Sequence, residues 1–303
     1  MTNPPSHYFL LAAKLVTLTF ILIAISGIGS SFLSVADSPG NAAQPAVLPL
    51  WLLFVIFFFQ ALALAIPVLW SRWTGWRLSA AMFVVYFGTV TVVTQIESLL
   101  YLGDKMPGNL VAGLFAMGLF VAAVFSPICV LVLGRWKARS TMDDLPAPVL
   151  NLGRWGWRVA AAGLVFVSLY YLFGYYIAWQ DPELRAYYEG TDPGSFFAQM
   201  KSIAQITPWM IALQYLRGSM YVGLGLLVIC AMRGSWWRAG LAIAMLFAVP
   251  TLYLLMPNPV MPDFPRMTHL IETLPYQFLF GWFLAWFLHR GSTGTQDSSA
   301  ARI

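Results

Sequence analysis

Residues 51–77, WLLFVIFFFQALALAIPVLWSRWTGWR, consist of an apolar run followed by a short loop rich in arginine and tryptophan. The run is interrupted by one polar residue, Gln60, and is long enough to cross the roughly 30 Å hydrocarbon core of a membrane as a helix. Arginine and tryptophan are expected where such a helix leaves the membrane on its cytoplasmic side. This stretch therefore predicts a transmembrane helix, with Gln60 as a hydrogen-bond donor to a neighbouring helix.

The same pattern recurs along the chain. Hydrophobic residues make up 59% of the 303 positions and charged residues 10%, whereas a soluble domain carries about 25% charged residues. The predicted spans are 8–32, 49–70, 78–101, 109–134, 159–180, 208–231, 239–256 and 269–289. The sequence thus predicts an all-α membrane protein, a bundle of about eight transmembrane helices.

Basic residues are distributed unevenly among the loops, and lysine and arginine in short loops favour the cytoplasmic side. The loops predicted to face the cytoplasm are 71–77, 135–158 and 232–238. Those predicted to face outwards are 33–48, 102–108, 181–207 and 257–268. Both termini are then cytoplasmic, and the predicted location is the inner membrane of a bacterial cell.

The first apolar run has some features of a secretory signal, because Ser34-Val35-Ala36 follows it and resembles a small-residue cleavage site. Cleavage there would leave seven helices and an outward N-terminus. The apolar stretch is longer than a typical signal core. We therefore expect it to remain as the first helix.

The two halves of the chain resemble each other. Residues 72–77, RWTGWR, follow the second span, and residues 233–238, RGSWWR, follow the sixth. Two parallel four-helix repeats, related by an axis along the membrane normal, would explain this; the alternative is that short Arg/Trp loops recur by chance. The predicted organisation is helices 1–4 in 1–134, a cytoplasmic linker 135–158, helices 5–8 in 159–290 with a periplasmic segment 181–207, and a cytoplasmic tail 291–303.

The periplasmic segment contains two helix-start signals. Asp181-Pro182-Glu183 combines an N-cap, a proline at the first helical position and an acidic residue in the first turn. This predicts a short helix through about Tyr188. Ser195 is predicted to cap a second helix whose apolar face lies on the membrane or covers the bundle.

Several ionisable residues fall inside the predicted spans, where charges are costly and usually face the bundle interior. Arg217 lies about nine residues into the sixth span, or ~14 Å deep, and Gln214 is one turn before it. Glu97 lies in the outer part of the third span, and His269 and Glu272 open the eighth. Pairing lowers the cost of buried charge, so we predict one polar cluster of Glu97, Arg217 and Glu272 with His269 at its edge.

Structural explanations remain open for each of these residues. Arg217 could pair with Glu97 or Glu272 only to lock helices, and His269 could bind a backbone carbonyl. Arg266 is expected to be a solvated residue at the membrane interface.

A metal site could use His269, Glu272 and Glu97, since three ligands and an open position suit a catalytic metal. The other two histidines, His7 and His289, are predicted on the cytoplasmic side and cannot join it. Cys129 and Cys230 form no CxxC motif, and phosphate-binding or hydrolase motifs do not occur. The sequence thus leaves the cofactor and the oligomeric state undetermined.

Three stretches carry a resemblance: FGYYIAWQ at 173–180, MPNPVMP at 256–262, and His269…Glu272…Phe280-Gly281. They resemble a group of bacterial multi-pass inner-membrane proteins without a characterised activity. The resemblance covers mainly the second half of the chain. It implies a bacterial inner membrane and adds no mechanism.

Three functions are compatible with these observations. The first is binding or transport of a small molecule or lipid, with Gln214 and Arg217 binding an anionic group, Glu97 and Glu272 carrying a proton or cation, and His269 tuning them. The second is a membrane-embedded enzyme acting on a lipid or lipid-linked substrate at the periplasmic leaflet through His269 and Glu272. The third is a structural or assembly subunit. The expected partners are the lipid bilayer and an anionic small molecule or lipid; the basic residues are topology signals and do not indicate nucleic acid.

Overall fold

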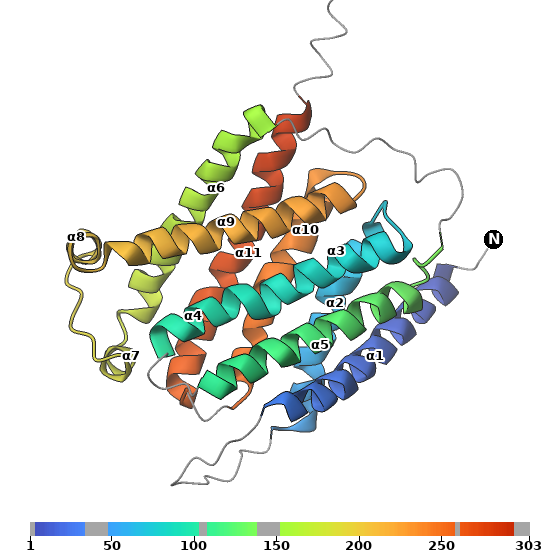
Figure 1. The fold of residues 1–303 in the computed structure, drawn as a ribbon, viewed down its shortest axis with the longest axis horizontal. Coiled ribbons are helices and arrows are strands. Elements are labelled where there is room, and N and C mark those ends of the chain that lie inside the picture. Colours follow the sequence, from blue (N-terminus) through green and yellow to red (C-terminus); the bar gives the residue numbers. More distant parts are fainter. Residues whose placement is uncertain (1–3, 34–47, 103–107, 138–151, 258–260, 294–303) are drawn as a thin grey trace, which may run out of the picture.

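The computed structural model describes residues 4–33, 48–102, 108–137, 152–257 and 261–293, which are almost entirely helical and contain no strand (Figure 1). The long helices are α1 (Pro4–Gly29), α2 (Leu50–Trp70), α3 (Gly75–Phe87), α4 (Val93–Leu102), α5 (Gly108–Val132), α6 (Leu152–Phe173), α8 (Phe196–Ile206), α9 (Pro208–Ala231), α10 (Trp236–Ala248) and α11 (Asp263–Thr293). The shorter elements are η1 (Ser30–Phe32), η2 (Gly88–Val92), η4 (Gly174–Ala178), α7 (Pro182–Tyr187) and η5 (Val249–Leu255).

Seven helical segments of the described chain are long and apolar enough to cross a membrane, which confirms the predicted all-α membrane bundle. They are Tyr8–Phe32, Leu50–Trp70, Gly75–Leu99, Asn109–Val132, Gly156–Ala178, Pro208–Ala231 and Trp236–Leu255. The eighth predicted span falls within α11, which at 31 residues is long enough but more polar than the others. α11 packs along α10 inside the bundle (Figure 1).

The loops predicted to be cytoplasmic meet at one end of the bundle. Ser71 and Met232 form an isolated antiparallel bridge. The backbone N–H of Arg72 donates to the carbonyl of Ala231 at 2.8 Å, and that of Arg233 donates to the carbonyl of Trp70 at 3.0 Å. α7 and α8 lie at the opposite end (Figure 1). The linker residues 138–151 and the cleavage-like sequence 34–36 lie outside the described residues.

Helix boundaries repeat at a fixed spacing. Arg72 and Arg233 are 161 residues apart, and the side chain of Arg233 donates through Nη2 to the carbonyl of Arg72 at 3.3 Å. The same spacing relates both ends of α3 to both ends of α10, and the start of η2 to the start of η5. The two halves therefore break the helix at the same point of the third and seventh spans.

Packing follows the same relation. In the first half α1 contacts α2 and α5, and α3 contacts α5; in the second half α6 contacts α9 and α11, and α10 contacts α11. The halves meet through α2 against α10 and through α3 against α9. α2 and α3 of the first half correspond to α9 and α10 of the second half. Interchanging the halves therefore turns the α2–α10 contact into the α9–α3 contact, as a twofold relation requires. Both observations agree with two parallel repeats related by an axis along the membrane normal.

Both helix-start signals of segment 181–207 form caps. The Asp181 carboxylate accepts from the backbone N–H groups of Glu183 and Leu184, and Ser195 Oγ accepts from the N–H of Ala198. Each side chain satisfies donors that the first helical turn leaves free. The predicted short helices are therefore confirmed as α7 and α8.

Candidate functional site

The third and fifth spans each contain a π-helical segment, η2 and η4. Such segments interrupt the regular hydrogen-bond ladder and are frequent at functional sites. In the first, Thr94 Oγ1 donates to the carbonyl of Thr89 at 3.1 Å and satisfies an acceptor of the widened turn. Glu97 follows one turn later, so η2 helps to set the direction in which it points.

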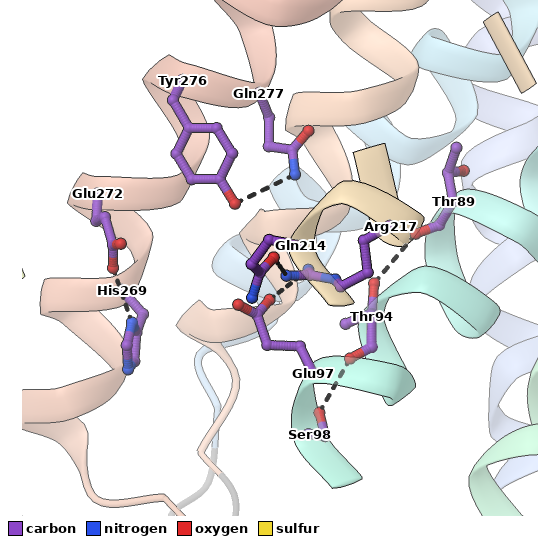
Figure 2. A network of polar contacts seen from close by, with 10 residues as sticks. All are labelled: Thr89, Thr94, Glu97, Ser98, Gln214, Arg217, His269, Glu272, Tyr276 and Gln277. Atoms are coloured by element: carbon purple, nitrogen blue, oxygen red, sulfur yellow. Dashed lines mark hydrogen bonds and ion pairs between the residues drawn. The ribbon is translucent and has the colours of Figure 1, made fainter. Parts of the chain in front are cut away.

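Arg217 is the centre of the site and is 1% exposed. Its Nη2 contacts Glu97 Oε2 at 2.6 Å, and its Nη1 donates to Gln214 Oε1 at 2.7 Å (Figure 2). The guanidinium also lies 5.9 Å from the ring centroid of Tyr170, within reach of a cation–π interaction. Glu97 belongs to the first half of the chain and Arg217 to the second. The ion pair therefore joins the two halves of the chain.

Three buried polar atoms around this ion pair have no hydrogen-bond partner in the described structure: Arg217 Nε, Gln214 Nε2 and Gln277 Oε1. Gln214 and Gln277 are 0% and 1% exposed. An unsatisfied buried donor or acceptor costs about 1–3 kcal/mol, and more for a charged group. Water or a ligand at these atoms would remove that cost.

His269 and Glu272 form a second contact on α11. His269 Nδ1 lies 3.0 Å from Glu272 Oε2, and its Nε2 lies 2.9 Å from the hydroxyl of Tyr188, at the end of α7. A proton on Nδ1 suits the carboxylate, in which case a neutral ring accepts from Tyr188 through Nε2. Glu272 Oε1 also lies close to η4, since a Cβ added at Gly174 would stand 3.3 Å from it.

The structure divides the predicted cluster into two adjacent parts (Figure 2). Arg217 contacts Glu97 and Gln214, whereas Glu272 contacts His269; among the described residues no hydrogen bond or ion pair links Arg217 to Glu272. The buried Tyr276, one turn after Glu272 on α11, lies near Glu97, Arg217 and Glu272 and thus beside both parts (Figure 2).

Sequence reasoning missed three tyrosines of the site: Tyr170, Tyr188 and Tyr276. The position of Tyr276, one turn after Glu272 on α11, is the signal that could have identified it. Tyr188 comes from segment 181–207 and is brought to His269 by the fold of α7.

The expectation that Arg266 is solvated is wrong. Arg266 is 2% exposed, donates through Nη1 to the carbonyl of Leu254 at 2.7 Å and pairs with Asp263. Leu254 lies in η5, near the end of the seventh span, where backbone carbonyls have no helical partner. Arg266 therefore caps a neighbouring helix end. Gln60 Nε2 donates to the carbonyl of Val249 at 3.1 Å, which confirms its predicted role between helices.

The possible metal site has no support in the geometry. Among the described residues, no three His, Cys, Asp or Glu side chains lie close enough to hold a metal ion. The reason is that Glu97 is directed to Arg217 and only His269 and Glu272 remain together.

No protein-family model matches the chain, and comparisons with curated proteins and with solved structures give no significant match.

Proposed function

We propose that this chain is a bacterial inner-membrane protein that binds or transports a small anionic molecule or a lipid through the site around Arg217. The site lies between the two repeats of a membrane bundle. Its guanidinium supplies the positive charge that an anionic group requires. Glu97 stands two residues before the end of the span Gly75–Leu99 and away from the arginine-rich loops, in what the predicted topology makes the outer half of the bundle.

The observation that carries this proposal is the pair of unsatisfied donors, Arg217 Nε and Gln214 Nε2. An unsatisfied Nε alone is not specific to a binding site, since Arg266, which caps a helix end, also has a buried Nε without a partner in the described structure; the particular feature of Arg217 is the second free donor beside it, Gln214 Nε2. Here one donor on each of two neighbouring residues stays free. An oxyanion is a suitable acceptor for both.

A second candidate is a membrane-embedded enzyme acting on a lipid or lipid-linked substrate at the outer leaflet. The contact series Tyr188–His269–Glu272 favours it, because a histidine held by a carboxylate is a common general base. A structural subunit is the third candidate, favoured by the Arg217–Glu97 pair alone. Neither explains the free donors.

Binding by the purified protein tests the proposal. We expect benzoate, inorganic phosphate or short-chain phosphatidylglycerol to raise the melting temperature of the wild-type protein in detergent, because each offers an oxyanion to Arg217. Gln214→Leu removes one donor and should weaken binding about tenfold. Calorimetric titration of both proteins gives the comparison.

Gln60→Leu is the matched control, because Gln60 is an equally buried glutamine that donates to Val249 away from the site. It should lower stability and leave the affinity unchanged. Equal affinity loss in both variants, or none in Gln214→Leu, would remove the support for a binding role.

The proposed orientation has its own test. In a variant with Cys129 and Cys230 replaced by serine, we expect Thr191→Cys to react with a membrane-impermeant maleimide in intact cells, because it lies in the exposed segment between α7 and α8. Ser235→Cys, exposed at the arginine-rich end, should react only after the cells are opened. The reverse pattern would invert the topology.

A further inference from the structure

We infer that Glu97 is an exchangeable counter-ion of Arg217: an incoming oxyanion takes its place on the guanidinium, and the released Glu97 carboxylate takes up a proton. This rests on the proposed function and adds proton coupling to it. In the exchange the Arg217–Glu97 contact breaks, the anion forms a new contact with the same cation, and one proton from water adds to Glu97. The net charge of the site stays the same.

The contacts of Arg217 permit the exchange. Glu97 contacts the guanidinium through Oε2 and Nη2, whereas Gln214 accepts separately from Nη1. The guanidinium would therefore keep its orientation after Glu97 leaves. Its free Nε and the free Nε2 of Gln214 are additional donors for the anion.

The two members of the ion pair differ in exposure, and this indicates which of them an incoming anion meets first. The side chain of Arg217 is 2% exposed and that of Glu97 is 31% exposed. Glu97 is thus the more accessible member of the pair, and an incoming anion would meet it before reaching Arg217. Glu97 closes the site until it is displaced.

The surroundings explain why the released carboxylate would take up a proton. The ionisable groups near Glu97 are Arg217 and Tyr221 on α9 and His269 and Tyr276 on α11; α6 adds Tyr170 beside the guanidinium. α5, which also contacts α4, carries no acidic, basic or tyrosine residue. Arg217 is the one permanent cation in this set. Once the anion neutralises it, a charged Glu97 would stand beside a second negative charge, and protonation relieves that repulsion.

Proton uptake during binding is the direct measurement. Wild-type protein in weakly buffered detergent is mixed with benzoate, inorganic phosphate or short-chain phosphatidylglycerol, with phosphatidylcholine as the comparison without net charge. We expect about one proton taken up per bound anion, and therefore an affinity that falls as the pH rises. Binding of the free anions would indicate a soluble ligand, and binding of phosphatidylglycerol alone a lipid headgroup.

Glu97→Gln should bind the same probe without proton uptake and with an affinity independent of pH. Glu183→Gln, an exposed carboxylate on α7, is the control and should behave as wild type. Binding without uptake in the wild type overturns the inference but leaves the proposed function standing. Uptake that persists in Glu97→Gln and disappears in Glu272→Gln also overturns it, since Glu272 would then be the proton acceptor.

If no probe binds, the proposed function is refuted. A measurement that needs no ligand then still tests the inference about Glu97. Arg217→Gln leaves Glu97 inside a membrane span without its cation, where a neutral carboxylic acid costs less than a carboxylate, so Glu97 should hold a proton and give the infrared C=O stretch of a carboxylic acid. The signal should be absent from the wild type and from the Glu97→Gln/Arg217→Gln double variant, which also controls for folding. If Arg217→Gln lacks the signal, the inference is wrong.

Discussion

Arg217→Ala is expected to lower the free energy of unfolding by about 3 kcal/mol, at the lower end of the range for breaking a buried ion pair because Glu97 is partly exposed. The substitution leaves Glu97 without its cation and Gln214 without its partner. It also removes the side chain that joins α9 to α4. Unfolding in mixed SDS–dodecylmaltoside micelles, followed by circular dichroism, measures the change.

The pairing itself is tested by adding Glu97→Gln to Arg217→Ala. A neutral side chain no longer needs the missing cation, so the double variant should recover about 1–2 kcal/mol. Lys201→Ala, which removes an exposed lysine on α8, should change stability by less than about 0.5 kcal/mol. Strictly additive effects of the two substitutions would show that Glu97 and Arg217 are not coupled.

The fold class was predictable because span length and apolar composition dominate membrane insertion. The breaks within the spans were not predictable from composition. Residues 78–101 form one continuous apolar run, yet the chain changes from α-helix to π-helix at Gly88. Such a change depends on packing: a Cβ added at Gly118 of α5 would stand 2.0 Å from Thr91 Oγ1, so α5 lies directly against this turn.

The polar residues of the site were predictable from the sequence, whereas the pairing among them was not. Burying Arg217 near the midplane required a counter-ion, and Glu97 and Glu272 were the available carboxylates. Whether Glu97 or Glu272 pairs with Arg217 depends on how α4 and α11 are rotated about their axes. The π-helical segment η2 changes the rotation of α4. The surroundings of Arg266 were not predictable either. Its position after a loop suggested a solvated side chain, but the fold places the carbonyl of Leu254, near the end of η5, beside it.

The packing of α11 leads to the second large effect, on Gly281→Ala. A Cβ at Gly281 would stand 2.7 Å from both Cα and N of Ala244, on α10. These are backbone atoms, so α10 and α11 must separate to admit one methyl group. Small residues allow helices to approach this closely. We expect the substitution to lower the free energy of unfolding by about 3 kcal/mol, the upper part of the range for overpacking.

Gly223→Ala is the matched control, because a Cβ there meets no atom within 4 Å and Gly223 lies inside α9. Alanine lowers the flexibility of the unfolded chain, so this variant should be as stable as wild type or more stable by about 0.5–1 kcal/mol. Glu272 and Tyr276 precede Gly281 on the same helix, so separation of α10 and α11 should also displace them and weaken anion binding. Wild-type stability in Gly281→Ala would mean that the two helices do not approach as closely as the structure places them, and the positions of His269 and Glu272 would have to be revised with them.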